Sequence, residues 1–308
     1  MAANIRLTLS EDTAVVSPTG AALMEYTVGD RPVVVSMNAF DGAVLAPWPN
    51  RIADGRFEFN GHRHQLPITE PARNTALHGL VAQTDWQVTA SDDSSVSLNT
   101  TIPSSEGYPF ELILDAKYSL SDDGIIVRAR AQNPGSHSVP FGFGFHPWFH
   151  PGSAEIDQSQ LSLPAETWFE TDERLIPVEE KPFDTGSLIP TDHEHDETPC
   201  IVCKDFRSLR TVASTVLDDA FGSPQRGADG WSRARLKGAD GRTIQVGMDE
   251  HFRTWQVCTG DELPGERRRR AIAIEPMTCA PNAFATGADF DVIDPHDELS
   301  VEWTIGLH

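Results

Sequence analysis

The chain has 308 residues, 39% of them hydrophobic, and its 46 acidic and 24 basic side chains give a formal net charge of −22. This balance argues against nucleic acid and anionic membranes as partners, because nucleic-acid affinity comes mostly from Lys and Arg that neutralise phosphates. No apolar run approaches the ~20 residues that span a bilayer, and residues 1–13 lack the charged start and apolar core of a secretory signal, so we expect a soluble, cytoplasmic protein.

In the first half of the chain, β-branched and alternating segments bounded by turn residues predict short strands. The expected strands cover residues 5–9, 13–17, 32–37, 86–90, 96–102, 110–120 and 125–132. The last four are expected to form two hairpins, because clusters of Ser, Asp and Gly separate the members of each pair.

The stretch between these strands carries a hairpin of its own. Residues 56–59 alternate polar and apolar side chains, as a half-buried strand does, and the Asn-Gly pair at 60–61 is a strong two-residue hairpin turn. If this hairpin closes, its ends come near each other. Asn50 and Arg51, before it, and His78, after it, are therefore predicted to line one pocket.

The second half of the chain begins with residues 141–150, which are dense in aromatic residues and glycine. Residues 151–215 are less periodic and rich in Pro, Asp and Glu, so we expect long loops there with a short strand at 160–163. Further strands are expected at residues 233–237, 243–248, 254–259, 271–275 and 299–307. A charged loop, residues 260–270, would join two of them.

No segment shows sustained helical periodicity, and the chain has neither an internal repeat nor a low-complexity linker. Many strands at hairpin spacing predict an all-β fold, namely a large antiparallel β-sandwich. We expect one domain that spans residues 1–308.

Two clusters resemble metal sites. Cys200 and Cys203 form a lone C-x-x-C pair without the second Cys or His pair of a zinc site, so reduced, partly buried cysteines are the better interpretation. Residues 193–196, His-Glu-His-Asp, lie in a charged run that favours a solvated loop. The sequence therefore predicts no metal site.

Polar side chains at the ends of apolar stretches are candidates for chemistry. His146 is flanked by Phe145 and a Pro-Trp pair, and it is either a core histidine bonded to a carbonyl or one wall of a sugar pocket. Glu275 ends an apolar run, where apolar neighbours would raise its pKa; an exposed rim position is the alternative. Asp218, in Asp-Asp-Ala-Phe, is by itself predicted to lie in a turn.

Together these residues resemble the aldose 1-epimerase (mutarotase) family. Their order and approximate spacing match across nearly the whole chain. The matching elements are Asn50-Arg51-Ile52, Leu77-His78-Gly79, Phe145-His146-Pro147-Trp148-Phe149, Asp218 with Phe221, and Glu275-Pro276.

The resemblance implies a large antiparallel β-supersandwich with a sugar site in a cleft and no cofactor. It implies that Glu275 is the general base and His146 the general acid, while His78 assists at the ring oxygen or orients the sugar. The remaining implied contacts bind the sugar: Asn50, Arg51, Asp218 and Trp148. The expected reaction opens and recloses a free aldohexose, which needs one proton removed and one delivered, and positioned groups contribute ~10²–10⁴-fold each.

Three other functions remain open. A hexose-6-phosphate 1-epimerase would need a cationic site, for which the arginines at 267–270 are candidates, although a solvated loop neutralised by nearby acids also explains them. A glycosidase would need paired carboxylates, of which we find one well-placed member. A non-catalytic carbohydrate-binding protein would keep Trp148 without needing both Glu275 and His146. The sequence does not decide between a monomer and a homodimer.

Overall fold

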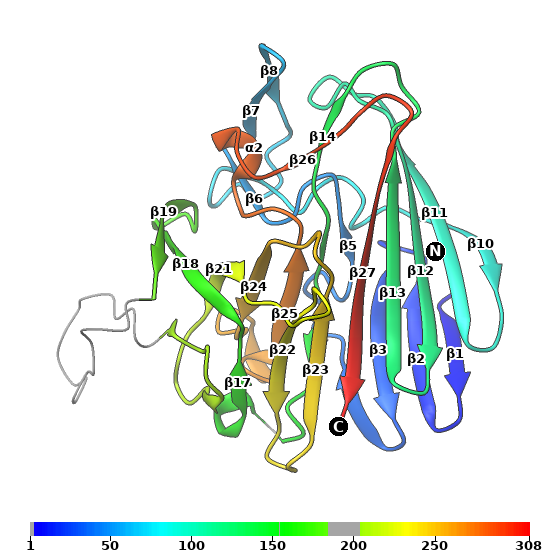
Figure 1. Ribbon diagram of the computed structural model, residues 1–308, viewed down its shortest axis with the longest axis vertical. Helices are drawn as coiled ribbons and strands as arrows, with labels where there is room; N and C mark the ends of the chain where they lie inside the picture. Colours follow the sequence, from blue (N-terminus) through cyan, green and yellow to red (C-terminus); the bar gives the residue numbers. More distant parts are fainter. Residues whose placement is uncertain (1–2, 154, 184–203) are drawn as a thin grey trace.

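The computed structural model describes residues 3–153, 155–183 and 204–308, which form antiparallel sheets with almost no helix (Figure 1). The larger sheet has twelve strands. Its main path runs β1-β2-β3-β4-β16-β25-β24-β21-β18-β19, with β15 attached to β25 and β5 attached to β15. The strands of this sheet are β1 (Ile5–Leu9), β2 (Asp12–Ser17), β3 (Ala22–Val28), β4 (Arg31–Val34), β5 (Val44–Leu45), β15 (Gly144–Phe145), β16 (Trp148–Phe149), β18 (Ala165–Thr171), β19 (Pro177–Pro182), β21 (Asp218–Pro224), β24 (Thr254–Cys258) and β25 (Ile272–Met277).

The second sheet has nine strands in the order β10-β11-β12-β13-β27-β23-β22-β17-β20. Its strands are β10 (Gln87–Ser91), β11 (Ser95–Ile102), β12 (Leu112–Ser121), β13 (Gly124–Gln132), β17 (Gln160–Ser162), β20 (Arg210–Thr211), β22 (Ser232–Lys237), β23 (Thr243–Met248) and β27 (Glu298–Leu307). Three strand pairs lie outside both sheets: β6 (Arg51–Ala53) with β9 (Thr75–Leu77), β7 (Arg56–Phe59) with β8 (His62–Gln65), and β14 (Val139–Phe141) with β26 (Asp291–Ile293).

The described residues contain little helix. There are two 3₁₀ turns, η1 (Ile156–Gln158) and η2 (Gly265–Arg267), and one short helix, α2 (Ala283–Thr286). None of the helices in these residues is long and apolar enough to cross a membrane.

The two large sheets pack face to face. Figure 1 shows β22 and β23 in front of β24 and β25. Side chains connect the layers: the ring centroids of Phe145 and Trp303 are 5.3 Å apart, and Trp255 Nε1 donates to Ser232 Oγ at 3.3 Å. Inward-facing residues of both sheets belong to one buried hydrophobic cluster. This is the aligned sandwich that alternating strands predict.

The central strand β25 is buried along its whole length, and its two faces differ. Ile272 and Ile274 belong to the main core between the sheets. Ala273 packs instead with Trp148 in a small second cluster on the other face. Because successive side chains of a strand alternate, Glu275 lies on the same face as Ala273, away from the main core.

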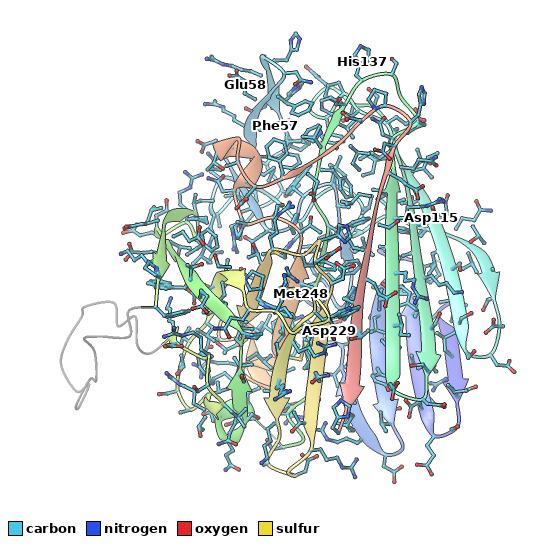
Figure 2. All side chains as sticks on the ribbon, viewed as in Figure 1. Phe57, Glu58, Asp115, His137, Asp229 and Met248 are labelled. Carbon is cyan, nitrogen blue, oxygen red and sulfur yellow. The ribbon has the colours of Figure 1, made fainter. Side chains whose placement is uncertain are left out.

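The all-β antiparallel fold is confirmed, and most strands lie within a few residues of their predicted bounds. The hairpin at 56–65 has the expected alternation: Phe57 is 5% exposed whereas Glu58 is exposed, and both are labelled in Figure 2. The turn is also as predicted, because Asn60 and Gly61 both have positive φ, 51° and 78°.

Three predictions were wrong in detail. The strand predicted at 32–37 ends at Val34, because Asp41 binds the backbone that follows it. Residues 165–182, predicted as loop, form the β18–β19 hairpin. Asp218 begins strand β21 rather than a turn, since β18 and β24 flank this strand on both sides. The cysteine pair 200 and 203 and the histidine cluster 193–196 lie outside the described residues.

Candidate active site

All seven residues predicted to form the site line one cavity of about 420 Å³. They come from distant parts of the sequence and are Asn50, Arg51, His78, His146, Trp148, Asp218 and Glu275. The cavity lies on the face of the twelve-stranded sheet that points away from the main core, where Glu275 projects from β25.

Pairing between β6 and β9 brings the first three residues together. Arg51 lies opposite Leu77 in this pair, so the residues just beyond, Asn50 and His78, are neighbours. His78 N donates to Asn50 O at 2.9 Å. Both residues have positive φ, 54° and 59°, a region that Asn and His occupy more readily than most residues do. The sequence predicted this closure at the β7–β8 hairpin, but the β6–β9 pair outside that hairpin makes the contact.

The ring of His78 has a defined tautomer. Asn50 N donates to His78 Nδ1 at 3.2 Å, so a neutral ring carries its proton on Nε2. Burial lowers the pKa of His78 well below its usual range, and the nearby His146 and Arg51 add to the effect. His78 is therefore a neutral hydrogen-bond donor at neutral pH.

The contact between His146 and Glu275 is the centre of the cavity. β15 and β16 both pair with β25, with Gly144 opposite Met277 and Trp148 opposite Ala273. This register places the intervening residue, His146, across from Glu275. His146 Nε2 lies 3.4 Å from Glu275 Oε1, and the two side chains are 9% and 2% exposed.

Burial changes the proton affinity of both groups. It raises the pKa of Glu275 well above its usual range, with a further contribution from Asp218. It lowers the pKa of His146 to about 4. Glu275 Oε2 is buried and has no hydrogen-bond partner among the described residues. A carboxyl group with a raised pKa thus lies against an imidazole whose pKa is lowered.

Arg51 is held by a carboxylate that the sequence did not single out. Its Nε donates to Glu70 Oε2 at 2.9 Å, and its Nη2 lies 3.8 Å from Asp218 Oδ2. Burial opposes ionisation of Glu70, but hydrogen bonds from Arg51 and Thr75 lower its pKa overall. The guanidinium of Arg51 is therefore fixed between two acidic side chains.

Asp218 is oriented by Gln256, another residue missed in the sequence. Gln256 Nε2 donates to Asp218 Oδ1 at 2.8 Å, and Gln256 lies directly opposite Glu275 in the β24–β25 pair. The Asp218 side chain keeps 32% of its surface exposed to the cavity. Partial burial there raises its pKa, and Arg51 opposes the rise.

Aromatic side chains cover the two histidines. Phe40 lies with its ring centroid 4.5 Å from His78 and 6.0 Å from His146. Trp148 Nε1 donates to Ala39 O at 2.8 Å, so its ring forms a fixed apolar wall. Asp41 pins the loop that carries Phe40 by accepting bonds from Met37 N and Asn38 N at 2.6 and 2.9 Å. The run Asn-Ala-Phe-Asp-Gly offered a turn signal here, but nothing that placed Phe40 over the histidines.

The rest of the wall comes from the β18–β19 hairpin and from the loop between β24 and β25. Three cations line the cavity, and each has a carboxylate partner: Arg51 with Glu70, Arg73 with Glu262 at 2.9 Å, and Lys204 with Asp219. None of the arginines at 267–270 is among its lining residues. Among the described residues, no group of three or more His, Cys, Asp or Glu side chains is arranged to hold a metal ion.

Comparison with known proteins shows the family of the chain. A family model described as aldose 1-epimerase matches residues 5–305. An uncharacterised protein of Escherichia coli K12, YihR, is 31% identical over 303 residues, covering 95% of this chain and 90% of that protein. Rat galactose mutarotase is 31% identical over 158 residues, which span 49% of this chain and 43% of the mutarotase.

Solved structures share the fold at low sequence identity. A putative aldose 1-epimerase from Escherichia coli K12 superposes with a TM-score of 0.81 at 18% identity and covers 99% of both chains. A GalM/aldose epimerase homologue from Caenorhabditis elegans gives a TM-score of 0.83 at 16% identity, covering 99% of this chain and 98% of its own. At these identities the likeness shows the fold alone.

Proposed function

The chain belongs to the aldose 1-epimerase family, and from that premise we propose that it interconverts the α and β anomers of a free aldohexose by acid–base catalysis. Family membership indicates an isomerase that acts on carbohydrates. The identity of the sugar and the roles of individual residues are our proposal.

The observation that carries the proposal is the 3.4 Å contact between Glu275 and His146 inside the cavity. Glu275 takes the proton of the C1 hydroxyl while His146 gives a proton to the ring oxygen, and the bond between C1 and that oxygen breaks. The open aldehyde turns about its C1–C2 bond. As the ring closes on the other face, Glu275 returns its proton to the C1 oxygen and His146 takes its proton back from the hydroxyl that attacks C1. No electron or other group is transferred.

The reaction requires that Glu275 and His146 hold one proton between them. Because Glu275 and His146 are in contact, they titrate as a pair. With a raised pKa on the carboxyl and a pKa of about 4 on the imidazole, the singly protonated pair holds its proton on Glu275. The reactive form, with ionised Glu275 and protonated His146, carries the same single proton. It therefore forms by transfer within the pair and without solvent.

The other predicted residues hold the substrate. The Nε2–H of neutral His78 donates to the ring oxygen or to a neighbouring hydroxyl. Asn50, Arg51 and Asp218 bind the remaining hydroxyls, and their geometry is fixed by Glu70 and Gln256 before a sugar arrives. Trp148 forms an apolar wall for the C–H face of the ring. A cavity with an apolar wall and a few convergent polar groups is typical of small-ligand sites.

A neutral sugar suits this cavity better than a sugar phosphate. Its three cations already have carboxylate partners among the described residues. The carboxyl groups of Glu275, Asp218 and Asp261 also line it. A dianionic phosphate would therefore meet negative charge without a free cation. This favours the free aldose over the hexose 6-phosphate.

The test is anomer-resolved NMR on a panel of free aldoses and their 6-phosphates, started from one pure anomer. We expect the protein to speed equilibration of at least one free aldohexose above the spontaneous rate, with or without a chelator. Tight sugar binding with no acceleration would indicate a carbohydrate-binding protein instead. Activity lost to the chelator and restored by a divalent ion would contradict the proposed metal-free reaction.

A further inference from the structure

The four consecutive arginines at 267–270 divide into two groups in the structure. Arg269 is 7% exposed, and its guanidinium binds Asp157 Oδ1 at 2.8 Å and Asp261 Oδ2 at 3.0 Å. It thereby anchors the loop between β24 and β25. Arg267, Arg268 and Arg270 instead line a hollow of about 800 Å³ outside the candidate active site.

The lining of this hollow combines basic and apolar side chains. The three arginines line it together with His150 and with the apolar residues Pro32, Val35 and Met37. Its other lining residues are Ser36, Glu155, Gly265 and Glu266. Three guanidinium groups thus face two carboxylates. This local excess of positive charge is unusual in a chain of net charge −22.

The arginines keep unused hydrogen-bond donors. Among the described residues, the Arg267 side chain donates from Nη1 alone, to Met37 O at 2.9 Å, and Arg268 makes long bonds of 3.3 Å to Asp261. The backbone N of Arg270 donates to Arg267 O at 3.3 Å, but its side chain makes no hydrogen bond or ion pair with any described residue. A guanidinium offers five N–H donors in a planar fork, so most of the donors around this hollow are available to a ligand.

His150 adds a further donor and reports on the local potential. Its Nδ1 accepts from Gly152 N at 3.1 Å, so the neutral ring carries its proton on Nε2. Burial lowers the pKa of His150, and the positive charges of Arg31 and Arg270 lower it further. An anion in the hollow would oppose that second effect.

We propose that this hollow binds the phosphate group of a small phosphorylated molecule, at a site distinct from the sugar cavity. Planar guanidinium groups match phosphate oxygens in pairs, and the apolar lining residues would contact the organic part of the ligand. The two pockets are neighbours, because Met37, which lines the hollow, packs in the same small cluster as Trp148, which lines the sugar cavity.

Binding is measured by calorimetry with inorganic phosphate and with glycerol phosphate, at constant ionic strength so that screening does not change. We expect one site per chain. Arg270→Gln should weaken binding about tenfold, the scale of a lost hydrogen bond to a charged group, and it removes no side-chain hydrogen bond or ion pair with the described residues. Arg235→Gln removes an exposed arginine on β22 and should leave phosphate binding unchanged.

The location is tested by NMR of the His150 ring and by competition. Phosphate should raise the pKa of His150 in the native chain, and a saturating concentration of a free aldose should not displace the bound phosphate. Absence of binding for both probes, equal binding by Arg270→Gln, or displacement by the aldose would each overturn the proposal. None of these measurements depends on epimerase activity, so the outcome is separate from that of the proposed function.

Discussion

At the scale of single residues, the motifs identify side chains that line the cavity but not those that hold them in place. The seven predicted residues all line one cavity. Glu70 and Gln256 were missed because each acts through a partner, Arg51 and Asp218, that is distant in sequence. Phe40 was missed because a lone aromatic residue in a turn has no periodicity to reveal its direction.

The first prediction concerns the coupling of His146 with Glu275. His146→Asn keeps a polar side chain but cannot donate a proton to the ring oxygen, so we expect turnover to fall by ~10²-fold or more. Because both residues act on one reaction coordinate, the double variant with Glu275→Gln should be little slower than the slower single variant. Steady-state polarimetry of the three variants measures this. Strictly multiplicative losses would mean that the two side chains act independently.

The second prediction is a bell-shaped pH profile of kcat/KM. On the acidic side, activity should fall as the pair takes up a second proton, near the depressed pKa of His146 of about 4. On the alkaline side, it should fall as the pair loses its only proton, at the raised pKa of Glu275. The limbs belong to the pair rather than to one residue. A rate that stays constant from acidic to alkaline pH would be inconsistent with a titrating pair.

At the scale of elements, the alternation of polar and apolar side chains predicted most strands. Where this local pattern was misleading or missing, pairing with strands distant in sequence determined the structure. The alternation at 56–59 is local, and the hairpin forms as expected. The Asp-Asp pair at 218–219 also looks like a turn locally, but pairing with Cys258 and Val257 of β24 holds it in a strand. The acidic, proline-rich segment that forms β18 and β19 gave no alternation from which to predict them.

The third prediction concerns the close contact between Gly79, just after β9, and the backbone of Ala46. Gly79 has a φ of +71°, and an added Cβ would lie 2.1 Å from Ala46 O. Gly61 has a similar φ of +78° but no heavy atom within 4 Å of an added Cβ. Gly61→Ala should cost only the left-handed backbone conformation, about 1–2 kcal/mol of unfolding free energy.

Gly79→Ala should lower the unfolding free energy by the same cost of the left-handed conformation and by roughly 1–3 kcal/mol more, because the backbone must shift to admit the methyl group. The shift would also displace the adjacent His78, so catalysis should fall in the Gly79 variant and not in the Gly61 variant. Urea unfolding followed by activity assays compares the two. Equal stabilities would show that the contact with Ala46 is not restrictive.

At the scale of the whole molecule, composition predicts which partners the surface disfavours, but it does not describe the site. The net charge of −22 applies to the entire surface, whereas the sequence could not say where the arginines at 267–270 would lie. In the structure one of them anchors a loop and three surround a hollow outside the sugar cavity. They therefore give no support to a phosphate subsite within that cavity.

The fourth prediction follows from this charge distribution. A free aldohexose should have a higher kcat/KM than its 6-phosphate, since the phosphate meets paired cations and a negative protein. Added salt screens charge–charge repulsion, so it should raise kcat/KM for the phosphate while leaving the neutral sugar nearly unchanged. A higher kcat/KM for the phosphate at low salt would favour the hexose-6-phosphate epimerase instead.

The central claim is that Glu275 accepts a proton during the interconversion of sugar anomers. Exchange NMR at chemical equilibrium measures this most directly, because it reports the rate of anomer interconversion without a coupled enzyme. The native chain should produce exchange between the α and β signals of a free aldohexose. Glu275→Gln, which keeps the shape of the side chain, should fold normally, still bind the sugar, and lose exchange by ~10²-fold or more. A folded Glu275→Gln variant with near-native exchange would contradict the account and leave this carboxyl group with a structural role.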